Sequence, residues 1–334
     1  MKEILYNPVF SQEKFNRAKE KIKVNLSSMP QSAVSRAIEE LYRGHPYGNS
    51  ARKILEEIDN VTLEDVINFY NSIISNSQAV AVMTGPTSKN PGIKTDIINF
   101  LQNKLPVYKQ FNYVNDVNVP LLKNTKVITQ AEERNQAHIV QMFRIRESGN
   151  VKDQAAVYLL NKILGGDSQS RLFMDLREGQ KLAYKVCSSY TTNNKTGELT
   201  LEIKTTTRSN KPDQYLNLQK ALNGFKSNIN RLIHTPVSQE ELEGAKLSLK
   251  SDLIFTAESS QNVNGMILDG FNSPYGAVYN KELFDIIDKI TPSDIQNAAK
   301  IYLTNPSVIS IIASKDTLEK NKDYLLNLGQ LVTF

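Results

Sequence analysis

The sequence contains very little cysteine, histidine and tryptophan, and these shortages narrow the possible functions. Its 334 residues include one cysteine, three histidines and no tryptophan. The single Cys187 excludes an intrachain disulfide bond and a thiolate metal cluster, because both need several sulfur atoms; it is predicted to be an inert, buried thiol, and it leaves the cellular compartment open. His45, His138 and His234 lie 93 and 96 residues apart, so they form no local zinc motif and each is predicted to be structural.

The chain also lacks a large charge of one sign and a long apolar run. Forty lysines and arginines against thirty-five acidic residues give a net charge of +5, spread along the chain. This small surplus argues against a dedicated nucleic-acid binder. No apolar run approaches the roughly 20 residues that a membrane-spanning helix needs, and residues 1–30 do not have the layout of a signal peptide. The length and the 40% hydrophobic content instead indicate a globular chain of about two domains.

An internal repeat refines this domain count. Residues 8–26 resemble residues 236–253, Pro46-Tyr47-Gly48 matches Pro274-Tyr275-Gly276, and residues 58–85 resemble residues 287–314. The offsets are 227, 228 and 229 residues, which indicates a duplicated unit of that length. The first copy lacks its front half, so we expect the chain to be a piece of a longer polypeptide or a truncated gene product.

The repeat predicts the domain boundaries. Residues 1–106 are the rear half of a first unit, residues 107–123 a linker, and residues 124–334 a complete second unit. In both copies a hydroxyl residue precedes an amphipathic run with early acidic residues, which predicts helices beginning after Ser11, Ser238, Thr62 and Thr291. Short apolar β-branched runs then predict a strand at 79–83 in the first copy and at 308–312 in the second.

The second unit has the pattern of an α+β domain. Strands are predicted at 126–129 and 138–145, followed by a helix over 155–164 that stops at Gly165-Gly166. A second helix through Leu176 and a hairpin of strands 183–191 and 198–207 come next. The rest is predicted to be mostly helical, ending with the strand at 308–312 and a helix near 316–328.

The stretch from Leu164 to Tyr184 resembles a signature of the pitrilysin/insulinase (M16) family of zinc metallopeptidases. Two further segments, residues 44–48 and 236–242, are similar to other landmarks of that family. The resemblance covers nearly the whole chain. It implies an α+β fold of duplicated LuxS/MPP-like units, each with an antiparallel-rich sheet packed with helices.

The resemblance also implies a substrate site. Members of this family enclose an unfolded peptide within four such units; one unit supplies the zinc through an HxxEH helix and a downstream Glu, and another supplies an Arg and a Tyr seven residues apart. Arg177 and Tyr184 match that spacing, and with Gly165 and Gly166 they are the expected substrate-binding residues. The alternative from the residues alone is a surface arginine and a tyrosine in the hairpin core.

The departures from the family pattern concern the metal. The chain has no HxxEH motif, and Ala18 occupies the position that resembles the third zinc ligand. We therefore expect no catalytic residue and no bound zinc in this chain, with zinc present only in the complete enzyme. The expected partners are a peptide and an HxxEH-bearing catalytic half, in the same polypeptide or a separate subunit. The alternative is a catalytically inactive assembly subunit, similar to the core proteins of respiratory complex III within that family.

Overall fold

The structure is a computed structural model, and it describes most of the chain. The described residues are 7–29, 32–76, 80–85, 89, 91–104, 119, 121–146, 150–193, 196–208, 211–272 and 276–332. They form two compact units, one of Met1–Gln31 with His45–Val119 and the other of Ser32–Gly44 with Pro120–Phe334. The sequence did not predict that Ser32–Gly44 would group with the second unit. Most of the predicted linker, 107–123, lies outside the described residues.

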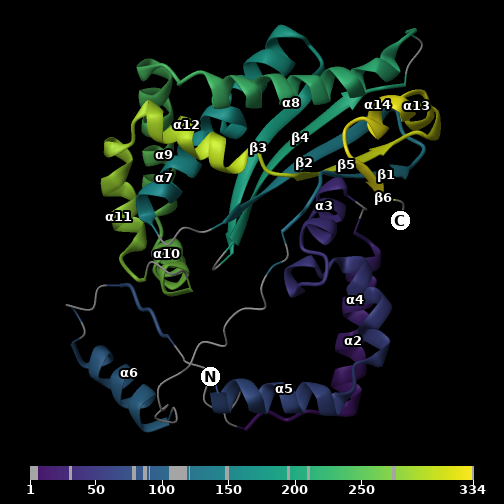
Figure 1. The fold of residues 1–334 in the computed structure, drawn as a ribbon. Coiled ribbons are helices and arrows are strands. Elements are labelled where there is room, and N and C mark those ends of the chain that lie inside the picture. Colours follow the sequence, from purple (N-terminus) through teal and green to yellow (C-terminus); the bar gives the residue numbers. More distant parts are fainter. Residues whose placement is uncertain are drawn as a thin grey trace. The chain divides into compact units, whose positions relative to one another are not determined.

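The second unit is built on a six-stranded sheet (Figure 1). Its strands are β1 (Lys126–Ala131), β2 (Gln136–Arg146), β3 (Ala183–Asn193), β4 (Thr196–Thr206), β5 (Ser307–Ala313) and β6 (Gln330–Val332). They lie in the order β3-β4-β2-β5-β1-β6. The first three neighbouring pairs are antiparallel, while β1 runs parallel to β5 and β6. The predicted antiparallel-rich α+β fold is therefore confirmed, and the sheet is mixed.

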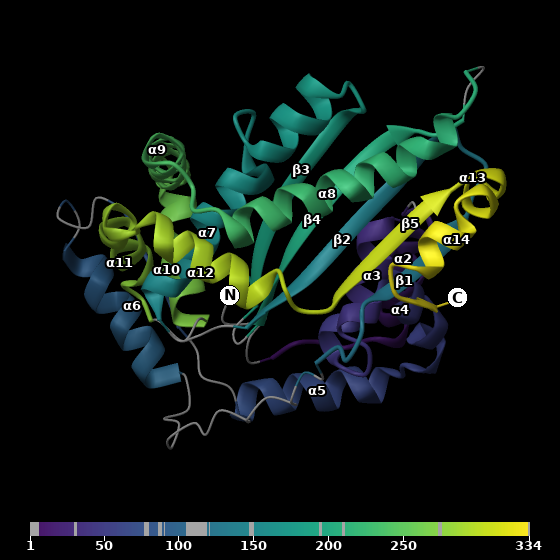
Figure 2. The same cartoon turned by 45° about the horizontal axis from the view of Figure 1, so that its top comes forward.

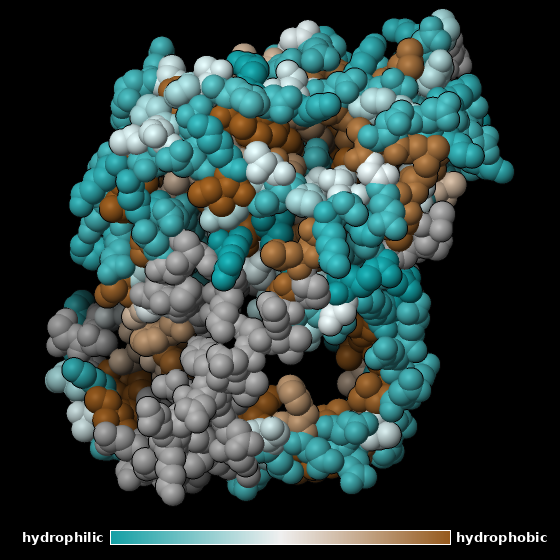
Figure 3. Space-filling view, in the orientation of Figure 1, coloured by the Kyte–Doolittle hydropathy of each residue, from teal (hydrophilic) through white to brown (hydrophobic). Residues whose placement is uncertain are grey.

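Helices cover one face of this sheet. They include α7 (Val151–Asn161), α8 (Asn217–His234), α9 (Gln239–Thr256), α10 (Ser260–Asn272), α11 (Tyr279–Ile286), α12 (Pro292–Tyr302), α13 (Lys315–Lys320) and α14 (Lys322–Leu326). Figure 2 shows α8 lying along the strands. Alternate residues of β2, such as Ile139 and Phe143, point into a single core that also contains Leu160 and Phe225. The visible face of this helical layer in Figure 3 is mostly hydrophilic, as binary patterning requires.

The other face of the sheet is partly covered by one short helix, α3 (Ala33–Leu41). It contacts β2 and β5 and buries Ala33, Ala37 and Leu41. The opposite set of β2 side chains, including Val140 and Met142, is buried on this side. The sheet therefore has apolar neighbours on both faces. The neighbour on this face, α3, comes from a segment far upstream in the sequence.

The first unit is helical in its described part. It contains α2 (Gln12–Ser27), α4 (Ala51–Glu57), α5 (Leu63–Asn76) and α6 (Pro91–Lys104), with the 3-10 turns η1 (Pro46–Gly48) and η2 (Ile58–Asn60). As predicted, the Ser11 side chain accepts a hydrogen bond from the first turn of α2, and Ser238 does the same for α9. Thr62 and Asp65 form the predicted reciprocal cap before α5.

The predicted strand at 79–83 is wrong. Residues 80–83 have no regular secondary structure, and Ala79 lies outside the described residues. An apolar β-branched run becomes a strand only where another strand completes its hydrogen bonds. The described part of the first unit contains no strand to do so. In the second copy the matching run is β5, which pairs with β1 and β2.

Candidate functional site

Arg177 and Tyr184 are brought together by the fold. Arg177 lies in a π-helical segment, η5 (Phe173–Gly179), and Tyr184 lies near the start of β3. The guanidinium carbon of Arg177 is 4.5 Å from the ring centroid of Phe173 and 5.0 Å from that of Tyr184. Both distances are within cation–π range, so the guanidinium contacts both aromatic rings. π-Helical turns are rare in proteins, and those that occur are often found at functional sites.

The exposure of Tyr184 follows from an irregularity in β3. The pairing of β3 with β4 shifts between Ala183 and Lys185, which leaves Tyr184 as the extra residue of a β-bulge. Bulges re-aim side chains and recur beside active sites. The Tyr184 side chain is 84% exposed. The alternative of a tyrosine in the hairpin core is therefore wrong.

A tight turn connects the helical segment that carries Arg177 to the strand that carries Tyr184. The helix ends as the N–H of Gln180 donates to the carbonyl of Asp175 (2.8 Å) and that of Leu182 to Leu176 (2.9 Å). Between them Lys181 adopts a left-handed conformation, with φ of 51°, which is typical of the residue that ends a helix. Leu176 and Leu182 are buried, so the core holds both ends of the turn.

Gly165 and Gly166 lie in a second π-helical segment, η4 (Lys162–Gly166), that packs against β3. Gly165 is buried, and a Cβ there would come 2.4 Å from the backbone nitrogen of Ser188. The Ser188 hydroxyl also donates to the side chain of Asn161, at 2.7 Å. Close packing of η4 on β3 therefore accounts for glycine at 165, and it fixes the strand that carries Tyr184.

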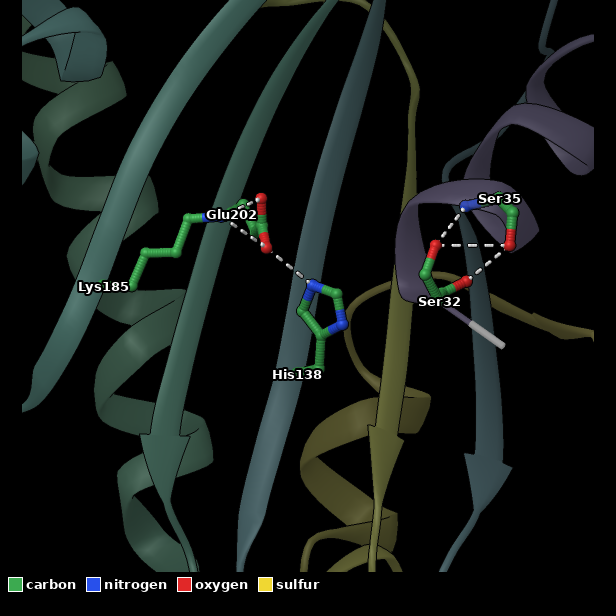
Figure 4. A network of polar contacts seen from close by, with 5 residues as sticks. All are labelled: Ser32, Ser35, His138, Lys185 and Glu202. Carbon is green, nitrogen blue, oxygen red and sulfur yellow. Dashed lines mark hydrogen bonds and ion pairs between the residues drawn. The ribbon is translucent and has the colours of Figure 1, made fainter. Parts of the chain in front are cut away.

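A charged network lies on the sheet face opposite the α7–α8 layer (Figure 4). Nε2 of His138 on β2 lies 3.0 Å from Oε1 of Glu202 on β4, and Nζ of Lys185 on β3 lies 3.3 Å from Oε2 of the same carboxylate. The hydrogen bond from His138, with a smaller effect of Lys185, lowers the pKa of Glu202 to about 2. Glu202 was not among the residues expected from the sequence. The predicted hairpin register, which places alternate residues on a common face, was the signal that could have found it.

This pKa predicts how stability depends on pH. The folded-state pKa of Glu202 is below the unfolded value of about 4.3, so its contribution is complete above that pH and is lost as the pH falls toward 2. We expect the parent to lose up to about 3 kcal/mol more of its free energy of unfolding over this window than Glu202→Gln. Urea unfolding of both proteins at a series of pH values measures the difference. Parallel curves would show that the carboxylate is not stabilised by the fold.

Cys187 fits the prediction of an unreactive thiol. It is half-buried on β3, and burial, with a smaller contribution from Glu202, raises the pKa of its sulfhydryl. Because the thiolate is the reactive form, we expect Cys187 to react with a disulfide reagent at pH 8 about tenfold more slowly than a free cysteine peptide. Absorbance of the released thiol gives the rate. A rate equal to that of the peptide would contradict the assignment.

A buried polar network holds the end of α3 on the sheet. The phenol of Tyr42 donates to Oε2 of Glu198 at 2.6 Å, and the guanidinium of Arg144 stacks 5.0 Å from the Tyr42 ring and donates to the carbonyl of Leu41. Burial raises the pKa of Glu198 and of Tyr42. These groups are structural, and they fix the face of the sheet that carries His138 and Glu202.

An open cavity lies at the end of the sheet where β3 begins and β4 ends. Its volume is about 650 Å³, and its lining includes Arg134, His138, Lys204 and Arg208. The register places Ala183 opposite Thr205, so Tyr184 belongs to this same end. Glu132 also lines this cavity, and Arg134, Arg208 and His138 are paired with the carboxylates of Glu132, Glu133 and Glu202, so most of the basic groups at this end already have acidic partners.

Zinc does not fit the residues that the structure describes. No cluster of three or more His, Cys, Asp or Glu that could hold a metal occurs among the described residues. Ala18, at the position that resembles a zinc ligand, lines a cavity with Phe15, Ile22 and the ammonium of Lys19. Zinc needs several imidazole, thiolate or carboxylate donors, and this lining supplies none. Within the same described residues, no helix is long and apolar enough to cross a membrane.

The α+β unit, with Arg177 and Tyr184 in contact near the start of β3, is the type of unit that the resemblance implied. The sequence profile described as "Peptidase M16 inactive domain" matches residues 60–249, more than half of the chain. The chain belongs to this family, which confirms the resemblance that the motifs indicated.

Relatives and solved structures agree with this assignment. The chain is 31% identical over 139 residues to the "Uncharacterized zinc protease YmxG" of Bacillus subtilis; this match covers 42% of the chain and about a third (32%) of that relative's length. It is 23% identical over 333 residues to the "Non-peptidase homolog YmxG" of Helicobacter pylori, covering 94% of the chain and 71% of the relative. The crystal structure of a peptidase M16 inactive domain from Pseudomonas fluorescens has the same fold, with a TM-score of 0.76, 18% identity, and coverage of 94% of this chain and 74% of that one.

Proposed function

We propose that this chain is the non-catalytic half of a paired zinc endopeptidase, in which it binds an unfolded peptide while a separate HxxEH-bearing half supplies the metal. The observation that carries the proposal is the stacked pair of Arg177 and Tyr184 at an exposed β-bulge. A tyrosine packed in the core would not need a β-bulge to turn its side chain toward solvent. The exposed Tyr184 hydroxyl and the half-buried Arg177 guanidinium together have several O–H and N–H donors, which suit a ligand rich in carbonyl oxygens.

The proposed roles follow from the chemistry of the two side chains. Contact with the Phe173 and Tyr184 rings restricts the Arg177 guanidinium, and the planar guanidinium has several N–H groups that can bind carbonyl oxygens. The nearest carboxylate, on Glu178, lies 3.5 Å from Nε. The remaining N–H groups and the Tyr184 hydroxyl would hold peptide carbonyls beside the scissile bond. There they would also stabilise the developing oxyanion.

A mixing experiment tests this function. The purified chain alone is expected to leave a fluorogenic unfolded peptide uncleaved, and addition of a family polypeptide that carries the HxxEH helix is expected to produce cleavage. Cleavage by the partner that this chain does not increase, at any ratio of the two, would contradict the proposal.

The second candidate function is an assembly subunit without a substrate role. It is favoured by the Helicobacter pylori relative, which matches almost the whole chain and is named a non-peptidase homolog. In that case, substitution of Arg177 or Tyr184 would leave the activity of the assembly unchanged.

A further inference from the structure

The two repeat copies share a structural device that the sequence alone did not predict. In the first copy, the ammonium of Lys19 on α2 donates to the carbonyls of Asp59 (2.9 Å) and Val61 (3.0 Å). In the second copy, the ammonium of Lys246 on α9 donates to the carbonyl of Asp288, at 3.1 Å. The α2 helix is therefore the structural counterpart of α9, held on an equivalent 3-10 turn.

The two helices differ in what covers their apolar faces. On α9, Leu249 is 6% exposed, whereas its counterpart Ile22 on α2 is 45% exposed. On the following turn, Ile290 is 1% exposed and its counterpart Val61 is 40% exposed. Figure 3 shows hydrophobic side chains at the surface along α2 and α5. The same positions are thus core residues in one copy and surface residues in the other.

The exposed positions form one groove, which we call the α2 groove. It has a volume of about 320 Å³ and a mostly apolar lining that includes Ala18. Its lining includes Phe10, Phe15, Ala18, Ile22, Ile58 and Val66. The polar lining residues are Ser11, Lys14 and Lys19, and the Lys19 ammonium donates to backbone carbonyls.

In the second copy, α7 covers the equivalent face. It packs against α9, α12 and η7 (Ile287–Lys289). Its buried side chains, Ala155, Ala156, Leu159 and Leu160, share one core with Leu242, Ala245 and Leu249 of α9. Ala18 in the α2 groove is the counterpart of Ala245, which belongs to this core.

We infer that the α2 groove binds an apolar helix with the character of α7, supplied by another polypeptide segment of the assembly. The repeat defines the occupant, because the equivalent face is already occupied by such a helix within this chain. The contact is a packing interface that requires no metal, since the groove contains no zinc donor set. It does not depend on the proposed role of Arg177 and Tyr184.

A synthetic helix tests the inference. The probe is a fluorescently labelled peptide with the sequence of residues 150–164, and its anisotropy is followed as the intact chain is added. We expect saturable binding that EDTA does not change. We expect Ile22→Asp to weaken it about tenfold or more, because a carboxylate would be buried without a partner. Val24→Asp is the matched control: Val24 lies on the same helix, is 66% exposed and does not line the groove.

Two further variants keep the test decisive. Val61→Asp, on the opposite wall, is expected to weaken binding as Ile22→Asp does, and a peptide with aspartate at both positions 159 and 160 is expected not to bind. Circular dichroism establishes that each protein variant is folded. The inference is overturned if the folded parent shows no saturable binding up to the peptide's solubility limit, or if Ile22→Asp and Val61→Asp bind as well as Val24→Asp.

Discussion

Replacement of Arg177 by alanine is expected to lower peptide cleavage by the complete peptidase about 100-fold, the usual cost of removing one oxyanion donor. The free energy of unfolding of the chain should change by only about 1 kcal/mol, the value of its stacking on Phe173 and Tyr184. The loss should appear mainly in kcat, because the contact strengthens as charge develops on the peptide carbonyl. Steady-state kinetics of the reconstituted enzyme measure it.

Two companion variants separate the roles of the Arg177/Tyr184 pair. Tyr184→Phe keeps the ring that stacks on the guanidinium and removes only the hydroxyl, so we expect a smaller loss, about tenfold. Arg231→Ala, at an exposed position in the last turn of α8, is the control and should leave the kinetics unchanged. If Arg177→Ala behaves like Arg231→Ala, the chain is an assembly subunit and the substrate role is wrong.

Substitution of Gly165 by alanine is expected to be the most destabilising single change at this site, by about 3 kcal/mol. The new Cβ would lie 2.4 Å from the backbone nitrogen of Ser188, and a backbone atom in a paired strand cannot move aside as a flexible side chain can. Either η4 or β3 must shift, which would also displace the strand that carries Tyr184. Urea unfolding of the variant and the parent gives the difference.

Gly244→Ala is the matched control for that experiment. Gly244 lies within α9, and a Cβ there would have no neighbour within 4 Å. Alanine is the better helix former by about 1 kcal/mol, so this variant should be as stable as the parent or more stable. Equal stability of Gly165→Ala and Gly244→Ala would contradict the close packing of η4 on β3.

Features that depend on neighbours in the sequence were predictable. The capping hydroxyls of Ser11, Ser238 and Thr291 act on backbone groups three residues away, so a local pattern is sufficient. The hairpin of β3 and β4 and the seven-residue spacing of Arg177 and Tyr184 are local in the same sense. The strands β1, β2 and β5 were predicted because each contains an apolar run, whereas β6, a three-residue strand that pairs with β1, was not predicted.

Features that depend on distant partners were not predictable. The run at 79–83 has the composition of a strand, and whether such a run pairs depends on a partner strand that may lie anywhere in the fold. The grouping of α3 with the second unit depends on the sheet surface formed by β2 and β5. The bulge at Tyr184 is a one-residue slip in pairing with β4, which the sequence of β3 does not reveal.

The central claim is that this chain contributes peptide binding and no metal to a zinc peptidase. Metal analysis of the purified, folded chain, together with its cleavage of a fluorogenic peptide in the absence of any partner, tests this most directly. We expect substoichiometric, EDTA-removable zinc and no cleavage. Tightly bound zinc at one ion per chain, with proteolysis that EDTA abolishes and zinc restores, would contradict it.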